Sequence, residues 1–195
     1  MLKLAIDIDN VVVDFFSNFV TYCKENTTDF KDEMRIKALV SGFNYRFDIE
    51  DPKFVKIFKD FTNQRGHARS PFMCDDMEKV FYRIFGGAPL SCFVTSRPLK
   101  TQIETKKYLI DKFDVLKNTP VLYSSSEYRK AEVIKDIGGV THFIDDQVAY
   151  IKEVAWTNPE VKCLWFNAYE MPSSVCPTEA IEMNDWDQVL KHLGL

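Results

Sequence analysis

The chain has 195 residues, of which 46% are hydrophobic and 28% charged, and its formal net charge is -4. This composition excludes a disordered chain and allows a sizeable core, in one domain or in a core domain with a modest insert. The mildly acidic balance provides no basic field for a long nucleic acid. A small anionic ligand remains compatible with a local cation.

The five cysteines are scattered, and none forms a CxxC pair. We therefore expect reduced thiols packed in or near the core rather than a zinc site. No apolar run approaches the ~18 residues of a membrane span, and the N-terminal segment becomes acidic at Asp7 and Asp9, unlike a signal peptide. The expectation is a cytoplasmic protein with no membrane partner. The sequence does not determine the oligomeric state, and a homodimer is one of the alternatives.

Short apolar runs bounded by polar residues predict buried parallel strands. The first run turns abruptly acidic at its end (LKLAIDIDN). The five predicted strands cover residues 2–8, 90–95, 120–123, 142–144 and 161–166.

Helical spacing of apolar residues appears between the later runs. The predicted helices cover residues 103–113, 131–137, 148–155 and 186–193. Gly138 is a plausible stop for the second helix, and Asn184 a plausible cap for the last. Because strands and helices alternate from residue 89 onward, we predict an α/β fold with a Rossmann-like parallel sheet flanked by helices.

The stretch between the first two strands breaks this alternation. Phe15 and Phe19 begin one helical pattern, Pro52 suits the first turn of another, and residues 77–85 repeat the helical spacing almost perfectly. We therefore predict a small helical cap domain at residues 15–88, inserted after the first strand. The α/β core domain then consists of residues 1–14 and 89–195.

Polar residues suited to catalysis occur at the carboxyl ends of the predicted strands. They are Asp7 and Asp9 after the first strand, Thr95 and Ser96 after the second, and Asp145 and Asp146 after the strand at 142–144, with Lys130 opening the preceding helix. Open α/β sheets bind their ligands at this edge. Each signal alone has a structural reading as a helix cap, a turn or a solvated lysine, but their common placement favours a site.

Asp7 and Asp9 lie two residues apart near a strand end, so their side chains point the same way. Together with Asp145 they form an oxygen-rich set suited to Mg²⁺. One carboxylate can attack phosphorus while the other serves as general acid and base. The Thr95 hydroxyl, the Lys130 ammonium and the metal are suited to stabilise charge on the transferring oxygens.

The segments AIDIDNVVVDF, CFVTSRP, YRKAEVI and HFIDDQ resemble, in order, the four motifs of the haloacid dehalogenase phosphohydrolase superfamily. The resemblance spans roughly residues 3 to 150. It implies a Rossmann-like core with Asp7 as nucleophile and Asp9 as general acid and base, the backbone carbonyl of Asp9 also binding Mg²⁺.

The same resemblance gives roles to the remaining motif residues. Thr95 would bind the phosphoryl group, Lys130 would steady its charge and Asp145 would ligate the metal. Asp145 is the better candidate ligand of the two adjacent acids, and Asp146 would reach the metal either directly or through water.

The helical cap and the DxDxVxxDF opening resemble the 5'(3')-deoxyribonucleotidase group, as does the segment LWFNAYEM followed by a Trp-containing helix. In that group, the phenylalanine eight residues after the nucleophile packs on the nucleobase, and here that position is Phe15. The chain departs from the group's pattern at Asn10, where glycine is usual, and at Arg97 after the Thr-Ser pair. The resemblance implies a nucleoside monophosphate as substrate.

Several further residues are candidates for substrate binding. Phe15 either stacks on a base or packs within the cap. Tyr45 and Arg46 lie in the aromatic segment GFNYRF, which would either grip a nucleotide or pack locally. Ser96 and Arg97 could add phosphate contacts.

The sequence thus predicts a Mg²⁺-dependent phosphomonoesterase that forms an aspartyl phosphate and acts on a small phosphorylated substrate, first among them (deoxy)nucleoside monophosphates. A phosphatase for a sugar phosphate or another small metabolite is the alternative within the same chemistry. A non-catalytic nucleotide-binding protein is the alternative in a different class.

Overall fold

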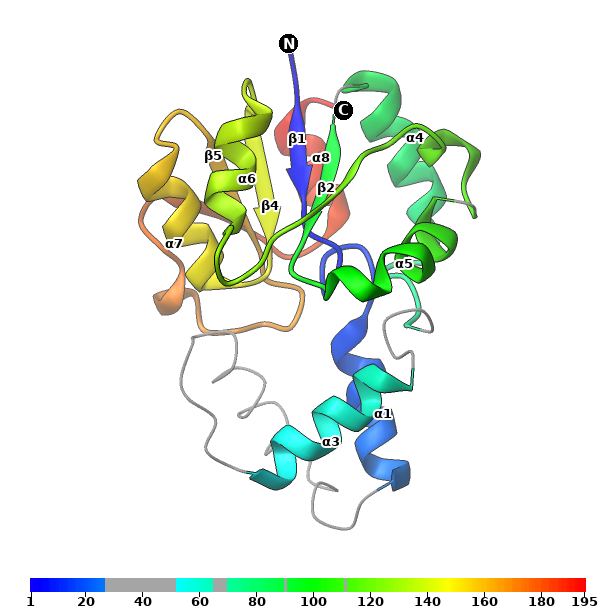
Figure 1. Cartoon of the computed structure of the whole chain (residues 1–195). Helices are drawn as coiled ribbons and strands as arrows, with labels where there is room; N and C mark the ends of the chain where they lie inside the picture. The colour runs from blue at the N-terminus through cyan, green and yellow to red at the C-terminus, as the bar shows by residue number, and fades with distance from the viewer. Residues whose placement is uncertain (27–51, 65–69, 90, 111) are drawn as a thin grey trace.

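The computed structural model describes residues 1–26, 52–64, 70–89, 91–110 and 112–195. Within these ranges a parallel sheet has the strand order β3-β2-β1-β4-β5-β6 (Figure 1). Its strands are β1 (Leu4–Ile6), β2 (Cys92–Thr95), β3 (Val121–Tyr123), β4 (His142–Asp145), β5 (Lys162–Phe166) and β6 (Ala180–Met183). The predicted Rossmann-like α/β fold is confirmed. The order reverses at β1, which pairs with β2 on one side and β4 on the other.

The helices are α1 (Phe15–Asn26), α3 (Pro52–Asn63), α4 (Met77–Gly87), α5 (Gln102–Leu109), α6 (Lys130–Ile137), α7 (Val148–Thr157) and α8 (Trp186–Leu193). Short 3-10 turns occur at Leu99–Thr101, Asp114–Leu116 and Ser173–Val175. None of the helices in the described ranges is both long enough and apolar enough to cross a membrane.

Two apolar layers cover the two faces of the sheet. Along β1, Leu4 and Ile6 belong to the cluster that includes α4 and α8, whereas Ala5 belongs to the cluster that includes α6 and α7. All three side chains are fully buried. This alternation follows from the opposite directions of successive side chains in a strand. Because both faces are covered, β1 is a continuous apolar run.

A third apolar cluster joins α1 and α3, which lie beyond the carboxyl ends of the strands (Figure 1). Phe19 of α1 is at its centre, with its ring 5.7 Å from Phe54, 5.4 Å from Phe58 and 5.2 Å from Phe61. Edge-to-face rings at such distances add to the free energy of burial. We call α1 and α3 the cap helices.

Helix α4 packs on the core and not with the cap helices, although the predicted cap at residues 15–88 included it. Its buried face (Met77, Val80, Phe81, Ile84, Phe85) belongs to the same cluster as β1 and α8. The Phe81 ring lies 6.1 Å from Phe93 of β2 and 5.2 Å from Phe113. The helix was predicted correctly, but its partner was not, because an apolar stripe does not specify the surface that it covers.

Two further details differ from the prediction. Asp185, not Asn184, caps α8, since its side chain accepts a hydrogen bond from the Gln188 backbone at 2.8 Å. The edge strand β6 was not predicted, because its side chains are mostly not buried and form no apolar run. The expected strand start at Leu90 lies outside the described residues.

All five cysteines carry free thiols, as expected. Cys23, Cys92 and Cys163 are buried, and burial raises the pKa of the Cys23 thiol to about 12. These thiols therefore act as small apolar side chains.

The packing of α4 predicts the effect of truncating Phe81, which is fully buried between α4 and the sheet. We expect Phe81→Ala to lower the free energy of unfolding by about 3–5 kcal/mol, because it leaves a cavity in the core. Urea denaturation followed by circular dichroism measures this change. Trp156→Ala is the control, since its side chain is 89% exposed and its removal should change stability by less than about 0.5 kcal/mol. Equal stability of the two variants would contradict the assignment of α4 to the core.

Candidate active site

The carboxyl end of β1 carries Asp7 into the middle of the sheet edge. The Asp7 backbone N–H donates to the Ile144 carbonyl of β4 at 2.9 Å, which extends the pairing of the two strands. The chain then turns at Asn10, whose φ is 62°, and the N–H groups of Val12 and Val13 donate back to the Ile8 carbonyl at 2.9 and 3.0 Å. This turn holds the segment that follows Asp7 against the sheet edge.

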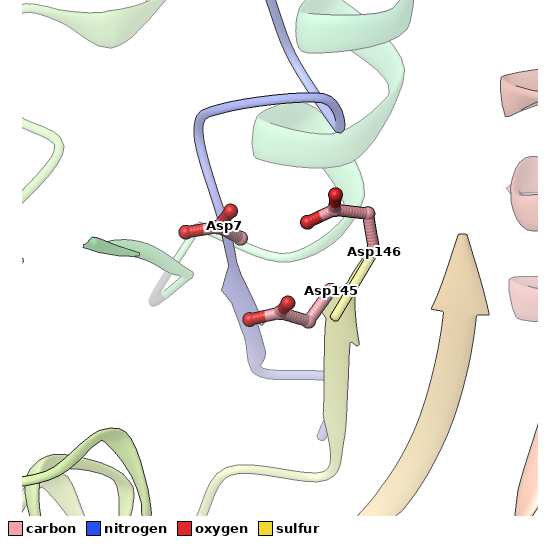
Figure 2. Close-up of side chains that lie close together, drawn as sticks. All are labelled: Asp7, Asp145 and Asp146. Atoms are coloured by element: carbon pink, nitrogen blue, oxygen red, sulfur yellow. The ribbon is translucent and has the colours of Figure 1, made fainter. Parts of the chain in front are cut away.

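Three carboxylates meet between the ends of β1 and β4 (Figure 2). Asp7, Asp145 and Asp146 each offer an oxygen within 4.8 Å of the others, and all three residues are buried. Figure 2 shows the Asp146 carboxylate directed toward Asp7 from the chain just after β4. We call these three residues the carboxylate cluster.

Lys130 connects two members of this cluster. Its Nζ donates to Asp7 Oδ1 and to Asp145 Oδ2, each at 2.6 Å, and the residue is 1% exposed. It also lies 4.5 Å from the centre of the Tyr150 ring. Lys130 begins α6, whose first turn is closed by the Glu132 side chain accepting from the backbone N–H of Arg129 at 2.6 Å. The sequence prediction that Lys130 joins the aspartates at this edge agrees with this geometry.

The charges of the cluster do not balance. Burial raises the pKa of Asp7 to about 7, and the ammonium of Lys130 only partly opposes this. The pKa of Asp146 is raised well above its ordinary value by burial and by the neighbouring Asp145 and Asp7. Burial opposes the charge of Lys130, but its two carboxylate partners outweigh burial and raise its pKa. Three carboxyl groups beside one ammonium cannot all ionise at low cost, and this is why their pKa values are raised.

The cluster has the donors to hold a divalent cation. Both oxygens of Asp145 have partners, since Oδ2 accepts from Lys130 and Oδ1 from the Gln147 backbone N–H at 2.8 Å. In contrast, Asp146 Oδ1 is buried and has no hydrogen-bond partner among the described residues. A buried oxygen without a partner is costly unless a cation or water binds it. Because all the donors are oxygens, the set suits a hard cation such as Mg²⁺.

Asp9 forms a bidentate ion pair with Arg97. Arg97 Nε donates to Asp9 Oδ2 at 2.9 Å and Nη2 to Oδ1 at 2.7 Å, while Nη1 donates to Thr105 Oγ1 at 3.2 Å. The Arg97 side chain is fully buried and that of Asp9 is 22% exposed. The two parallel bonds fix the plane of the carboxylate. Arg97 was expected to contact phosphate. In the structure it binds Asp9, the residue expected to act as general acid and base.

The residues after β2 take different positions. Thr95 is 1% exposed, and its Oγ1 accepts from the Arg97 backbone N–H at 3.2 Å. Ser96 is exposed, with its Oγ 2.9 Å from Ser124 Oγ and 3.1 Å from the Tyr150 hydroxyl. Ser96 lines the cavity described next, whereas Thr95 is not among its lining residues.

A cavity of about 490 Å³ separates the cluster from the cap helices. Its core side includes Asp7, Asp9, Ser96, Arg97 and Lys130, and its cap side includes Phe15, Phe16, Phe19, Phe54 and Phe58. Phe15 both lines this cavity and packs in the cap, with its ring 5.2 Å from that of Phe61. Tyr45 and Arg46, the other predicted substrate contacts, lie outside the described residues.

Sequence reasoning gave too little weight to three residues. Asp146 was expected to be a weaker candidate ligand than Asp145, and the structure places it beside Asp7 and Asp145 in the carboxylate cluster. Asn10 was noted only as a departure from a motif, yet its Nδ2 donates to Asp146 Oδ2 at 3.1 Å. Tyr150 was not singled out, although the helical pattern of α7 places it opposite Lys130. Of these three positions, only that of Asp146 had a signal in the sequence, namely its adjacency to Asp145.

The structure is similar to several solved structures. Magnesium-bound YfnB from Bacillus subtilis, described as a HAD-hydrolase, superposes with a TM-score of 0.66 at 16% identity, covering 100% of this chain and 99% of that one. A HAD family hydrolase from Deinococcus radiodurans with bound phosphate and sodium gives 0.63 at 10% identity, covering 98% and 94%. A protein from Clostridium difficile described as a phosphatase gives 0.61 at 16% identity, covering 100% of both chains.

Comparison with protein-family models finds no match. Comparison with curated protein sequences also finds none. At identities this low, the structural likeness establishes the fold alone, and it extends over nearly the whole length of these proteins. The chain has the fold of the haloacid dehalogenase-like hydrolases.

Proposed function

We propose that this chain is a Mg²⁺-dependent phosphomonoesterase that forms an aspartyl phosphate on Asp7 and acts on nucleoside monophosphates. The observation that carries the proposal is the buried carboxylate cluster with Lys130, which adjoins a cavity lined by the phenylalanines of the cap helices. The magnesium-bound and phosphate-bound structures of the same fold support it. A small phosphorylated substrate and a cytoplasmic location are part of the same proposal.

In the first half of the reaction, an oxygen of Asp7 attacks phosphorus and the bond from phosphorus to the ester oxygen breaks. Asp9 gives its proton to the departing oxygen. The carboxylate cluster would hold Mg²⁺, which would supply positive charge to the transferring phosphoryl oxygens. Lys130, 2.6 Å from Asp7 Oδ1, adds a second cation at the same position.

In the second half, water attacks phosphorus and the bond from phosphorus to Asp7 breaks. Asp9 takes the proton of this water, so the enzyme returns to its starting state. Arg97 holds both Asp9 oxygens in one plane beside the cavity. The phenylalanines of the cap helices limit the access of other water molecules, which protects the intermediate.

The aromatic wall of the cavity supports a nucleotide over a sugar phosphate. Phe15 and Phe58 can contact the face of a base, and stacking on an aromatic ring contributes about 1–3 kcal/mol per base. Lys59 and Thr62 of α3 also line the cavity and can bond to polar groups on the base edge. A sugar would meet the same wall with hydroxyl groups that need partners.

Phosphate release from a panel of nucleoside monophosphates and sugar phosphates, with and without Mg²⁺, tests the proposal. We expect hydrolysis of nucleotides that requires Mg²⁺, and a loss of at least about 10³-fold in Asp7→Asn, because an amide oxygen is a poor nucleophile. Asp76→Asn is the control, because Asp76 directly precedes α4 and its side chain is 70% exposed. Full turnover by Asp7→Asn would show that Asp7 is not the nucleophile. A preference for sugar phosphates would show that nucleoside monophosphates are not the substrates.

The role of Asp9 predicts a dependence on the leaving group. We expect Asp9→Asn to slow hydrolysis of a nucleoside monophosphate by about 10²–10⁴-fold, because its alkoxide leaving group needs a proton. Formation of p-nitrophenol from p-nitrophenyl phosphate in a single turnover should fall much less, since p-nitrophenolate leaves without protonation. Stopped-flow measurement with both substrates makes the comparison. An equal loss for the two substrates would show that Asp9 is not the general acid.

The raised pKa of Asp7 predicts how pH affects stabilisation by Mg²⁺. Without metal, ionisation of buried Asp7 destabilises the fold, and this penalty grows as pH rises from the ordinary value of 3.8 to about 7. Metal binding requires the ionised carboxylates and relieves their repulsion. We therefore expect the Mg²⁺-induced rise in Tm to be larger at about pH 8 than at about pH 5. Thermal denaturation with Mg²⁺ or EDTA measures it, and equal shifts at both pH values would contradict the electrostatic argument.

A further inference from the structure

Asn10 forms hydrogen bonds in two opposite directions. Its Nδ2 donates to Asp146 Oδ2 at 3.1 Å, within the carboxylate cluster. Its Oδ1 accepts from the Phe16 backbone N–H at 2.9 Å and from the Tyr169 hydroxyl at 3.2 Å. The residue is 6% exposed, so these bonds form away from solvent. One side chain thus joins the cluster to the first turn of cap helix α1.

The backbone conformation at Asn10 favours glycine over asparagine, so conformational preference alone does not explain the asparagine. Its φ of 62° lies in the left-handed region, which glycine adopts freely and asparagine tolerates better than most residues. Glycine would fit the turn at a lower backbone cost. The hydrogen bonds of the amide group offset that cost, so the side chain accounts for asparagine at this position.

The two oxygens of Asp146 are in different situations. Oδ2 is held by Asn10, while Oδ1 is buried without a hydrogen-bond partner among the described residues. The Asp146 carbonyl accepts from Trp165 Nε1 at 2.8 Å, which fixes the backbone behind the carboxylate. The remaining rotation of the carboxylate is set by Asn10. Figure 2 shows the resulting direction, toward Asp7.

The other end of the amide acts on α1. The first N–H groups of a helix lack partners within the helix, and a side-chain oxygen that accepts from one of them stabilises the helix start. Asn10 Oδ1 does this for Phe16, the second residue of α1. Tyr169 reinforces the junction, because its single hydroxyl hydrogen is shared between Asp14 Oδ1 at 2.7 Å and the more distant Asn10 Oδ1 at 3.2 Å.

We propose that Asn10 is a positioning residue that aims Asp146 at a divalent cation and couples occupancy of that cation site to the start of cap helix α1. The inference rests on the cation site of the proposed function and adds a connection from it to the cap. Cation binding tightens the orientation of Asp146, and through Asn10 it holds the backbone of Phe16 in place. The cap helix that lines the substrate cavity is thereby more ordered when the metal is bound.

Asn10→Gly tests the proposal, because glycine adopts the same φ and lacks the side chain that carries the amide. We expect the dissociation constant for Mn²⁺, measured by electron paramagnetic resonance, to increase by about 10-fold, as for other residues that orient metal ligands. Tyr169→Phe is the matched control. It removes the hydroxyl from both Asp14 Oδ1 and Asn10 Oδ1 and leaves the bond from Asn10 to Asp146, so its Mn²⁺ affinity should match that of the wild type.

Hydrogen exchange measures the coupling to the cap without any assay of activity. In the wild type, Mg²⁺ should slow exchange of the amide of Phe16 and of the next residues of α1, and in Asn10→Gly this protection should be lost. Equal metal affinity of Asn10→Gly and the wild type would overturn the inference and leave the proposed phosphatase intact. A wild type that binds neither Mg²⁺ nor Mn²⁺ would overturn both.

Discussion

The burial of three carboxyl groups beside a single ammonium, between β1 and β4, is the constraint on which the site depends. Asp7, Asp145 and Asp146 are buried at one point of the sheet edge, with Lys130 as the cation between two of them. Buried carboxylates without sufficient positive charge are expensive, and the raised pKa values of all three aspartates express that cost. A divalent cation bound there would offset this cost, because its charge stabilises the ionised carboxylates.

The sheet topology explains why the three buried aspartates lie at this position. The strand order reverses at β1, so the chain leaves β1 and β4 in the crevice that open α/β sheets use for ligands. Apolar layers on both faces of the sheet hold these strands rigidly, and Asp7 extends the β1–β4 pairing through its N–H to Ile144. The carboxylates therefore cannot move apart to relieve their repulsion.

Local patterns in the sequence predicted what depends on local chemistry. The apolar run before Asp7 predicted β1, and strand-end placement predicted that Asp145 and Lys130 would meet it. What the sequence did not reveal depends on contacts between distant segments. The stripe of α4 is equally compatible with cap and core, and the bond between Asn10 and Asp146 joins positions 136 residues apart. Patterns of hydrophobicity carry no information on such pairings.

The Arg97–Asp9 pair sets a condition on catalysis. Two N–H groups of Arg97 occupy both oxygens of Asp9, and this geometry belongs to the ionised carboxylate. The ionised form is the one that accepts a proton from water, whereas proton donation to a leaving group requires one of the two bonds to open. The bidentate pair therefore favours the second half of the proposed reaction, in which Asp9 acts as base, over the first half, in which it acts as acid. A substrate phosphoryl group, itself an anion beside Arg97, can compete for the guanidinium and release one Asp9 oxygen. The freed Asp9 oxygen can then carry the proton that it gives to the leaving group, and the carboxylate left by this transfer accepts both bonds from Arg97 again and serves as the base.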